Sequence, residues 1–150
     1  MNSIRRILLV LSILIAGNLY AGDFYDVTPV RVIDGDTVVV TIENVPDVFG
    51  ERIAVRIAGI DTPEIRGKCV GETRKANEAK LLVQNLFLRA RVVNVLGATR
   101  DKYFRIVGNI EVDGQDVSAI LLEKGLARLY DGGRKSDWCS YRRTRQATSP

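Results

Sequence analysis

Short runs of β-branched and aliphatic residues, each ended by turn residues, constrain most strongly what this 150-residue chain can fold into. Two such runs cover residues 25–33 and 37–43, and the Asp-Gly-Asp sequence at 34–36 between them is typical of a hairpin turn. A third run covers residues 52–60 and ends at Asp-Thr-Pro-Glu (61–64), where proline cannot donate to a strand ladder. The chain is therefore predicted to begin its folded part with three consecutive strands.

The periodicity then changes from that of a strand to that of a helix. Apolar residues at helical spacing predict an amphipathic helix over roughly residues 72–88; they are Ala76, Ala79, Leu82, Val83 and Leu86. Strand character returns at residues 92–96 and 104–112. These segments predict a helix that covers one face of a sheet, followed by two more strands.

A second, shorter helix is predicted after the Asp-Gly turn at residues 113–114. Asp116 is a suitable N-cap for a helix over residues 117–124, and Gly125 is a typical C-terminal stop. The order of three strands, a helix, two strands and a helix predicts a mainly β protein with helices (α+β). A five-stranded antiparallel Greek-key barrel of the OB type, with two or three helices, accommodates this order.

The first 21 residues are predicted to be a signal peptide. Arg5 and Arg6 precede an uncharged aliphatic run at residues 7–16, and Ala21 is a small residue suited to cleavage. We therefore expect an exported protein, periplasmic or secreted, that has no stable membrane association once the signal is removed. The alternative is an uncleaved membrane anchor, although the apolar run is shorter than the roughly 20 residues that a span needs. Residues 22–133 are expected to form one domain, followed by a basic tail at 134–150.

Two cysteines, Cys69 and Cys139, are expected to form one disulfide, because export places them in an oxidising compartment. Such a bridge would close a long loop and contribute about 4 kcal/mol in the chain-entropy model. The alternative is two separate buried thiols.

The chain contains no histidine, which excludes Ser-His-Asp and Cys-His catalysis and histidine-bearing zinc sites. With 46% hydrophobic and 27% charged residues it fits a soluble globular protein. Its net charge of +4 is unevenly distributed, because residues 22–133 hold 15 basic and 17 acidic residues. An enzyme of this composition must work with carboxylates, arginine, lysine and tyrosine, with or without a hard metal ion.

Carboxylates at the predicted strand ends are the candidate chemical groups. The acidic residues of 34–36 and 61–64 each have a purely structural interpretation, as turn residues or as a strand terminator. Together they offer the oxygen ligands that Ca²⁺ or Mg²⁺ requires. Arg56 shares a strand face with Ala54 and Ala58, and Arg105 begins a later strand; two arginines near a metal ion can hold a phosphate.

These residues resemble the signature blocks of the staphylococcal nuclease (thermonuclease) family. The matching segments, in order along the chain, are VIDGDT (32–37), VRI (55–57) with GIDTPE (59–64), NEA (77–79), DKYFR (101–105) and EKGLA (123–127). The resemblance covers roughly residues 25–130. It implies an OB-fold, Ca²⁺-dependent endonuclease that hydrolyses DNA and RNA to products with 3′-phosphates.

The resemblance also implies roles for individual residues. Asp36 and Asp61 would be carboxylate ligands of Ca²⁺, and Thr62 would add its backbone carbonyl. Glu64 would act on the attacking water, as general base or as its positioning group, while Arg56 and Arg105 would bind the scissile phosphate. The substrate-side positions would be Lys102, Tyr103 and Tyr130.

Two departures from the family pattern affect these expectations. Phe104 stands where the family commonly has glycine, and the C-terminal helix of the family is short or absent here. A bridge between Cys69 and Cys139 would hold the tail near the active-site loop in its place. A monomeric nuclease is expected; the alternative is an inactive OB module that binds nucleic acid or protein, for which paired carboxylates facing a phosphate have no use.

Overall fold

The computed structural model of the chain describes residues 22–101 and 105–140. The predictions for the signal peptide, for Lys102, Tyr103 and Phe104, and for the tail beyond residue 140 lie outside these residues. Within the described ranges, no helix combines the length and the apolar character that crossing a membrane requires.

The main sheet contains the five expected strands and two short ones. Its members are β1 (Gly22–Phe24), β2 (Thr28–Val32), β3 (Thr37–Thr41), β4 (Ile53–Ile57), β6 (Val93–Arg100), β7 (Ile106–Val112) and β8 (Gln115–Asp116). A second, two-stranded sheet pairs β5 (Ile60–Asp61) with β9 (Arg128–Leu129).

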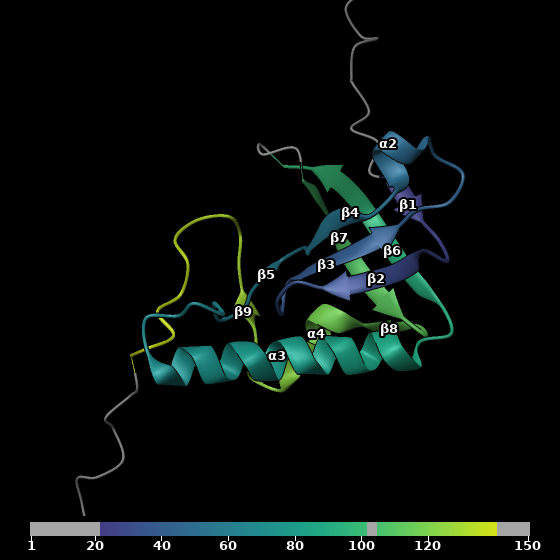
Figure 1. The fold of residues 1–150 in the computed structure, drawn as a ribbon. Helices are drawn as coiled ribbons and strands as arrows, with labels where there is room; N and C mark the ends of the chain where they lie inside the picture. The colour runs from purple at the N-terminus through teal and green to yellow at the C-terminus, as the bar shows by residue number, and fades with distance from the viewer. Residues whose placement is uncertain (1–21, 102–104, 141–150) are drawn as a thin grey trace, which may run out of the picture.

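The main sheet curls on itself, as Figure 1 shows, and confirms the α+β class with an OB-type barrel. Its strand order is β1-β6-β7-β4-β3-β2, with β8 paired to β7. Residues 25–27 are all that separates β1 from β2, so one stretch of chain pairs with β6 and then with β3. Because β1 and β2 are the first and last strands of the order, this stretch of chain connects the two ends of the sheet.

One expectation about the sheet is wrong, because β4 and β7 are parallel rather than antiparallel. Val55 pairs with Ile106 in this register. Parallel neighbours need a long connection that usually contains a helix, and residues 58–105 supply one. The periodicity of each strand indicates its buried face but not the direction in which it meets a partner distant in sequence.

Three helices lie in the described residues: α2 (Asp47–Gly50), α3 (Val70–Arg89) and α4 (Val117–Glu123). Figure 1 shows α3 running along the bottom of the sheet. The predicted apolar face of α3 is confirmed, with Ala76, Ala79 and Val83 buried. The Asp116 carboxylate accepts a hydrogen bond from the backbone N–H of Ser118 (2.8 Å), so the predicted N-cap of α4 is also confirmed. The single turn α2 lies in the connection between β3 and β4.

The hairpin turn between β2 and β3 approaches α3 closely. A Cβ atom placed on Gly35 would lie 2.7 Å from the Cβ of Ala79 and 3.0 Å from the Cβ of Thr62. Because real Cβ contacts are not this short, the turn can reach α3 only with glycine at this position. This close approach brings the residue after Gly35, Asp36, next to Thr62.

Candidate active site

Adjacent strands place Asp36 and Arg56 side by side. Thr37, the first residue of β3, pairs with Arg56 of β4, and the Ile57 N–H donates to the carbonyl of Asp36 (2.7 Å). In β4, Val55 and Ile57 point into the core, so Arg56 lies on the opposite face with Ala54. The predicted strand alternation therefore holds, and the guanidinium reaches the carboxylate of Asp36, the residue before β3.

The Asp36 carboxylate is buried and has partners at both oxygens. Oδ1 accepts from Arg56 Nη1 (2.9 Å) and from the Thr37 hydroxyl (3.0 Å), while Oδ2 accepts from the Thr62 N–H (3.1 Å). Burial raises the pKa of Asp36 to about 6, and Asp34 adds to this effect, although Arg56 and the two threonine donors act to lower it. A cation close to this carboxylate would favour its charged form.

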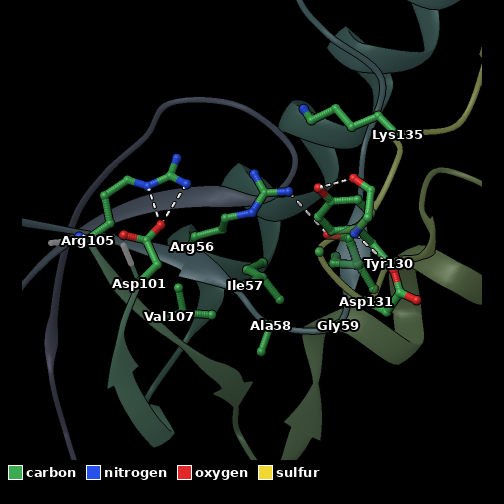
Figure 2. Close-up of a pocket in the computed structure, with 13 residues that line it drawn as sticks. Arg56, Ile57, Ala58, Gly59, Asp101, Arg105, Val107, Tyr130, Asp131 and Lys135 are labelled. Carbon is green, nitrogen blue, oxygen red and sulfur yellow. Dashed lines mark hydrogen bonds and ion pairs between the residues drawn. The ribbon is translucent and has the colours of Figure 1, made fainter. Parts of the chain in front are cut away.

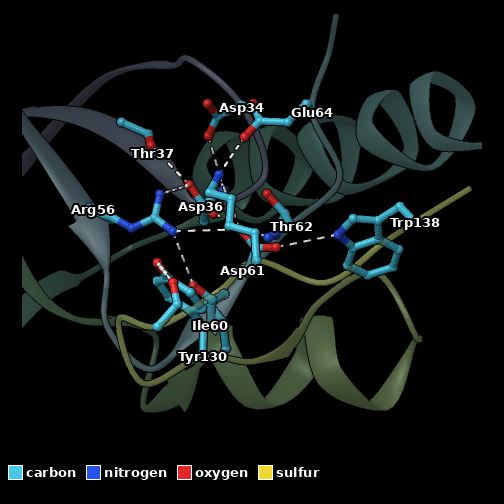
Figure 3. A network of polar contacts seen from close by, with 12 residues as sticks. Asp34, Asp36, Thr37, Arg56, Ile60, Asp61, Thr62, Glu64, Tyr130 and Trp138 are labelled. Atoms are coloured by element: carbon cyan, nitrogen blue, oxygen red, sulfur yellow. Dashed lines mark hydrogen bonds and ion pairs between the residues drawn. The ribbon is translucent and has the colours of Figure 1, made fainter. Parts of the chain in front are cut away.

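Asp61, at the end of β5, is 1% exposed. Oδ2 accepts from the indole N–H of Trp138 (3.4 Å). Oδ1 lies 3.2 Å from Lys135 Nζ and 3.8 Å from Arg56 Nη2, but among the described residues no donor meets it in hydrogen-bond geometry. Figure 3 shows Arg56 and Trp138 approaching Asp61 from opposite sides.

Glu64 is the exposed carboxylate of the group, and Lys135 Nζ forms an ion pair with its Oε1. Burial acts to lower the pKa of the Lys135 ammonium, but its contacts with Glu64 and Asp61 outweigh burial, and the pKa is raised. The ammonium therefore lies between two carboxylates to which the resemblance gives different roles.

The loop that carries Glu64 is organised around a buried carboxylate, Glu72 in the first turn of α3. Its Oε2 accepts from the Lys68 N–H (2.7 Å), and its Oε1 accepts from the Glu64 N–H (3.4 Å). Glu72 is 7% exposed. It therefore supplies acceptors to loop N–H groups that would otherwise be without a partner.

The donor set of this site fits a hard divalent cation. Asp36 and Asp61 are buried carboxylates, and Asp61 Oδ1 is a buried oxygen without a hydrogen-bond donor among the described residues. Oxygen ligands of this kind suit Ca²⁺ and Mg²⁺, whereas a softer metal ion prefers imidazole or thiolate; the sequence has no histidine, and the two cysteines nearby are bonded to each other.

A cleft of about 790 Å³ lies beside these carboxylates, and its lining includes three basic side chains, two aspartates and one tyrosine. Figure 2 shows Arg56 and Arg105 on the same side of the sheet, with Tyr130 and Lys135 at the other end of the cleft. The Tyr130 ring centroid lies 5.8 Å from the Arg56 guanidinium carbon. Arg105 contacts Asp101 through Nε (2.9 Å) and Nη2 (2.8 Å).

A disulfide between Cys69 and Cys139 is present, with the two Cα atoms 5.9 Å apart, and confirms the predicted bridge. It attaches the segment after residue 133 to the loop that follows Glu64. Trp138 in this segment stacks on Arg128, whose guanidinium carbon is 4.1 Å from the ring centroid. The expectation that the bridge would hold the tail near the active-site loop is therefore confirmed for residues up to 140.

The comparisons with known proteins agree with this architecture. Residues 54–148, more than half of the chain, match the family described as staphylococcal nuclease homologue. The chain belongs to this family. The endonucleases YokF (SPbeta prophage-derived) and YncB of Bacillus subtilis are 35% identical over 112 residues and 34% identical over 109 residues. The staphylococcal-like nuclease CAN1 of Arabidopsis thaliana is 31% identical over 84 residues.

The chain spans less than half of each of these relatives. The matches cover 71%, 69% and 56% of this chain, but 35%, 47% and 24% of YokF, YncB and CAN1 respectively. The shared part is therefore a domain of the size described here, within longer proteins.

In this member of the staphylococcal nuclease homologue family, most of the expected site residues lie together. Asp36 contacts both Arg56 and Thr62, and Arg56 also lies near Asp61. Lys135 contacts both Asp61 and Glu64 and so connects these two carboxylates. Arg105 and Tyr130 line the adjacent cleft. Lys102 and Tyr103 lie outside the described residues.

Sequence reasoning missed Lys135, Trp138 and Glu72 as parts of the site. A signal for Lys135 was available, because Cys69 follows Glu64 by five residues and Cys139 follows Lys135 by four. A bridge between the two cysteines therefore brings Lys135 and Glu64 within reach of each other. Glu72 had no comparable signal, since an acidic residue in the first helical turn is usually solvated.

Proposed function

We propose that this protein is an exported, Ca²⁺-dependent nuclease that hydrolyses phosphodiester bonds of DNA and RNA and leaves 3′-phosphates. The observation that carries the proposal is the position of Arg56. Its guanidinium contacts Asp36 and lies near Asp61, and it also lines a cleft that contains Arg105. One side chain thus connects an oxygen-ligand site for a cation with an anion-binding cleft.

The two buried aspartates supply the cation site. Asp36 and Asp61, with the Thr62 carbonyl, would hold Ca²⁺, which when bound offsets phosphate charge and polarises a phosphoryl oxygen. Repulsion between the aspartates is reduced by Arg56, which lies between them. Their burial excludes water, which strengthens each electrostatic contact within the site.

The arginines would bind the scissile phosphate. Arg56 is held by Asp36 (2.9 Å) and by the Ile60 carbonyl (3.4 Å), so its orientation is set before substrate arrives. Arg105 is oriented in the same way by Asp101 (2.9 Å). Guanidinium groups fixed in this manner stabilise the charge that accumulates on the phosphoryl oxygens in the transition state without reorganising.

Glu64 would act on the attacking water. As general base it takes a proton from the water while the water oxygen bonds to phosphorus and the bond from phosphorus to the 5′-oxygen breaks. The 5′-oxygen then takes up a proton, and the phosphate stays on the 3′-oxygen. The exposed position of the Glu64 side chain gives it access to water, unlike the two aspartates.

The test is digestion of single-stranded DNA, duplex DNA and RNA by the protein beginning at residue 22. Cleavage is expected with Ca²⁺, no cleavage with a chelator, and recovery when Ca²⁺ is restored in excess. Terminal phosphatase treatment followed by mass spectrometry should locate the phosphate on the 3′-end. Binding of nucleic acid without cleavage under all conditions would contradict an enzymatic function and support the binding-module alternative.

Export is tested separately. We expect a protein expressed from the full sequence in a bacterial host to be recovered outside the cytoplasm, with its N-terminus at Gly22. Mass spectrometry of the recovered protein measures the cleavage site, and retention of residues 1–21 in the membrane fraction would contradict cleavage.

A further inference from the structure

We propose that Lys135 is a built-in counter-ion of the acidic site, which a divalent cation must displace in order to bind. The inference rests on the proposed function, because it concerns the same carboxylates. The Lys135 ammonium lies 3.2 Å from Asp61 Oδ1 and forms an ion pair with Glu64 Oε1. The ammonium therefore lies between Asp61, which would bind the metal ion, and Glu64, which would act on the attacking water.

The charges around the site explain why an ammonium is favourable there. Asp34, Asp36, Asp61 and Glu64 come from two turns that pack together, and Figure 3 shows Asp34 and Glu64 above Asp36. Arg56 pairs with Asp36 and approaches Asp61 from one side only. Lys135 supplies positive charge to Asp61 Oδ1, the buried oxygen without a hydrogen-bond donor among the described residues, and so reduces repulsion with Glu64.

Three attachments keep the segment around Lys135 at the site. Cys139 is bonded to Cys69, the Trp138 indole donates to Asp61 Oδ2 (3.4 Å), and Arg128 Nη1 donates to the Asp137 carbonyl (3.1 Å). All three lie within four residues of Lys135. Such a short attachment gives the ammonium a high effective concentration at the two carboxylates.

A bound cation and the ammonium require the same oxygen atoms. A divalent cation at Asp61 Oδ1 repels the ammonium 3.2 Å from the same oxygen, so metal binding favours the state in which Lys135 has moved away. The apparent metal affinity is then the intrinsic affinity multiplied by the fraction of molecules in that state. Removing the ammonium, or releasing the segment that carries it, should increase the affinity.

The experiment is calorimetric titration of Ca²⁺ into the metal-free protein and two single variants. Lys135→Met is expected to bind Ca²⁺ about tenfold more tightly than the unsubstituted protein, as couplings of this kind are typically 5- to 150-fold. Arg134→Met is the matched control, because it removes an equal charge from the neighbouring exposed residue, which is not among the ion-pair partners of these carboxylates in the described part of the chain. The Ca²⁺ affinity of Arg134→Met should change by less than about threefold.

A second arm releases the segment without changing the charge. The double variant Cys69→Ser with Cys139→Ser retains Lys135 and should also bind Ca²⁺ more tightly, by several-fold. Metal-free Lys135→Met should in addition melt at a lower temperature than the unsubstituted protein, and saturating Ca²⁺ should remove this difference. If only the aliphatic stem of Lys135 mattered, Lys135→Met would melt at a lower temperature than the unsubstituted protein both without and with Ca²⁺.

The outcomes separate this inference from the proposed function. Equal Ca²⁺ affinity in Lys135→Met and the unsubstituted protein would overturn the role of Lys135 while the nuclease site stands. Equal gains in Lys135→Met and Arg134→Met would also overturn it, because they would show a general charge effect. Absence of Ca²⁺ binding in every variant would instead contradict the cation site of the proposed function and the displacement with it.

Discussion

Arg56 of β4 and Asp36, the residue before β3, form a mostly buried ion pair with 2.9 Å between Nη1 and Oδ1. The side chains are 14% and 5% exposed. Breaking such a pair leaves a carboxylate in a poorly solvated position. The ion pair therefore affects both the stability of the metal-free domain and the geometry of the cleft.

Arg56→Gln should destabilise the metal-free protein by about 3 kcal/mol, since it removes one partner of a buried pair. Urea denaturation in the presence of a chelator measures the change. Combining it with Asp36→Asn should restore part of the loss, because the unpaired carboxylate is then gone. Additive effects of the two substitutions would contradict a direct interaction.

The same Arg56→Gln substitution should lower nuclease turnover by about 10²- to 10³-fold, because a preorganised donor to the phosphate is lost. Arg56→Lys should recover little, since an ammonium lacks the planar fork that contacts Asp36 and the cleft together. Arg91→Gln, at an exposed arginine before β6, is the control and should keep full turnover. Normal activity of Arg56→Gln would reject its assignment to the phosphate.

Glu64→Gln should lower turnover by about 10²- to 10⁴-fold, the usual range for loss of a general base. The variant is expected to keep the stability of the parent, because the Glu64 side chain is 55% exposed. Glu43→Gln, at another exposed glutamate, serves as the control. Single-turnover cleavage with saturating Ca²⁺ separates the chemical step from cation binding, and an unchanged rate would exclude Glu64 as the base.

The disulfide should contribute about 4 kcal/mol to stability in the chain-entropy model, since it joins residues 70 positions apart. The double variant Cys69→Ser with Cys139→Ser should still fold, because the barrel core does not include either cysteine. Urea denaturation of both proteins under non-reducing conditions gives the difference. Two free thiols in the oxidised parent, detected by mass spectrometry, would contradict the bridge.

Gly35→Ala should destabilise the domain by about 1–3 kcal/mol and weaken Ca²⁺ binding several-fold. The added methyl would lie 2.7 Å from Ala79, so the turn before Asp36 must move away from α3. Gly71→Ala is the matched control, as open space surrounds that position, and should stabilise α3 by up to about 1 kcal/mol. Adding Ala79→Gly to Gly35→Ala should recover part of the Ca²⁺ affinity, and no recovery would argue against a steric cause.

Local features of the fold were predictable from the sequence because they depend on neighbouring residues. The buried face of α3 follows from helical spacing, and the cap at Asp116 follows from the preference of short polar side chains for that position. The exposure of Arg56 relative to Val55 follows from strand alternation. None of these three features depends on which strands become neighbours in the sheet.

Pairings between segments distant in the sequence were harder to predict from the sequence. The parallel contact of β4 with β7 depends on how the connection between them crosses the sheet, and strand periodicity carries no information about that path. The position of Lys135 depends on the disulfide and on the contact of Trp138 with Asp61. The resemblance indicated the candidate metal ligands and the two arginines by their motifs, but Lys135 lies in a segment without a comparable motif.

The small sheet formed by β5 and β9 has a consequence for the order of folding. Asp36 lies in the turn of a hairpin whose strands, β2 and β3, are adjacent in the chain, whereas Asp61 pairs with Arg128, 67 positions later. Contacts between distant residues form more slowly than local ones, because a large loop must first close. The two halves of the site are therefore completed at different times, and a partly folded or newly synthesised chain has its first aspartate in place well before its second. On this basis, a chain in which β5 and β9 have not yet paired lacks the complete pair of aspartates.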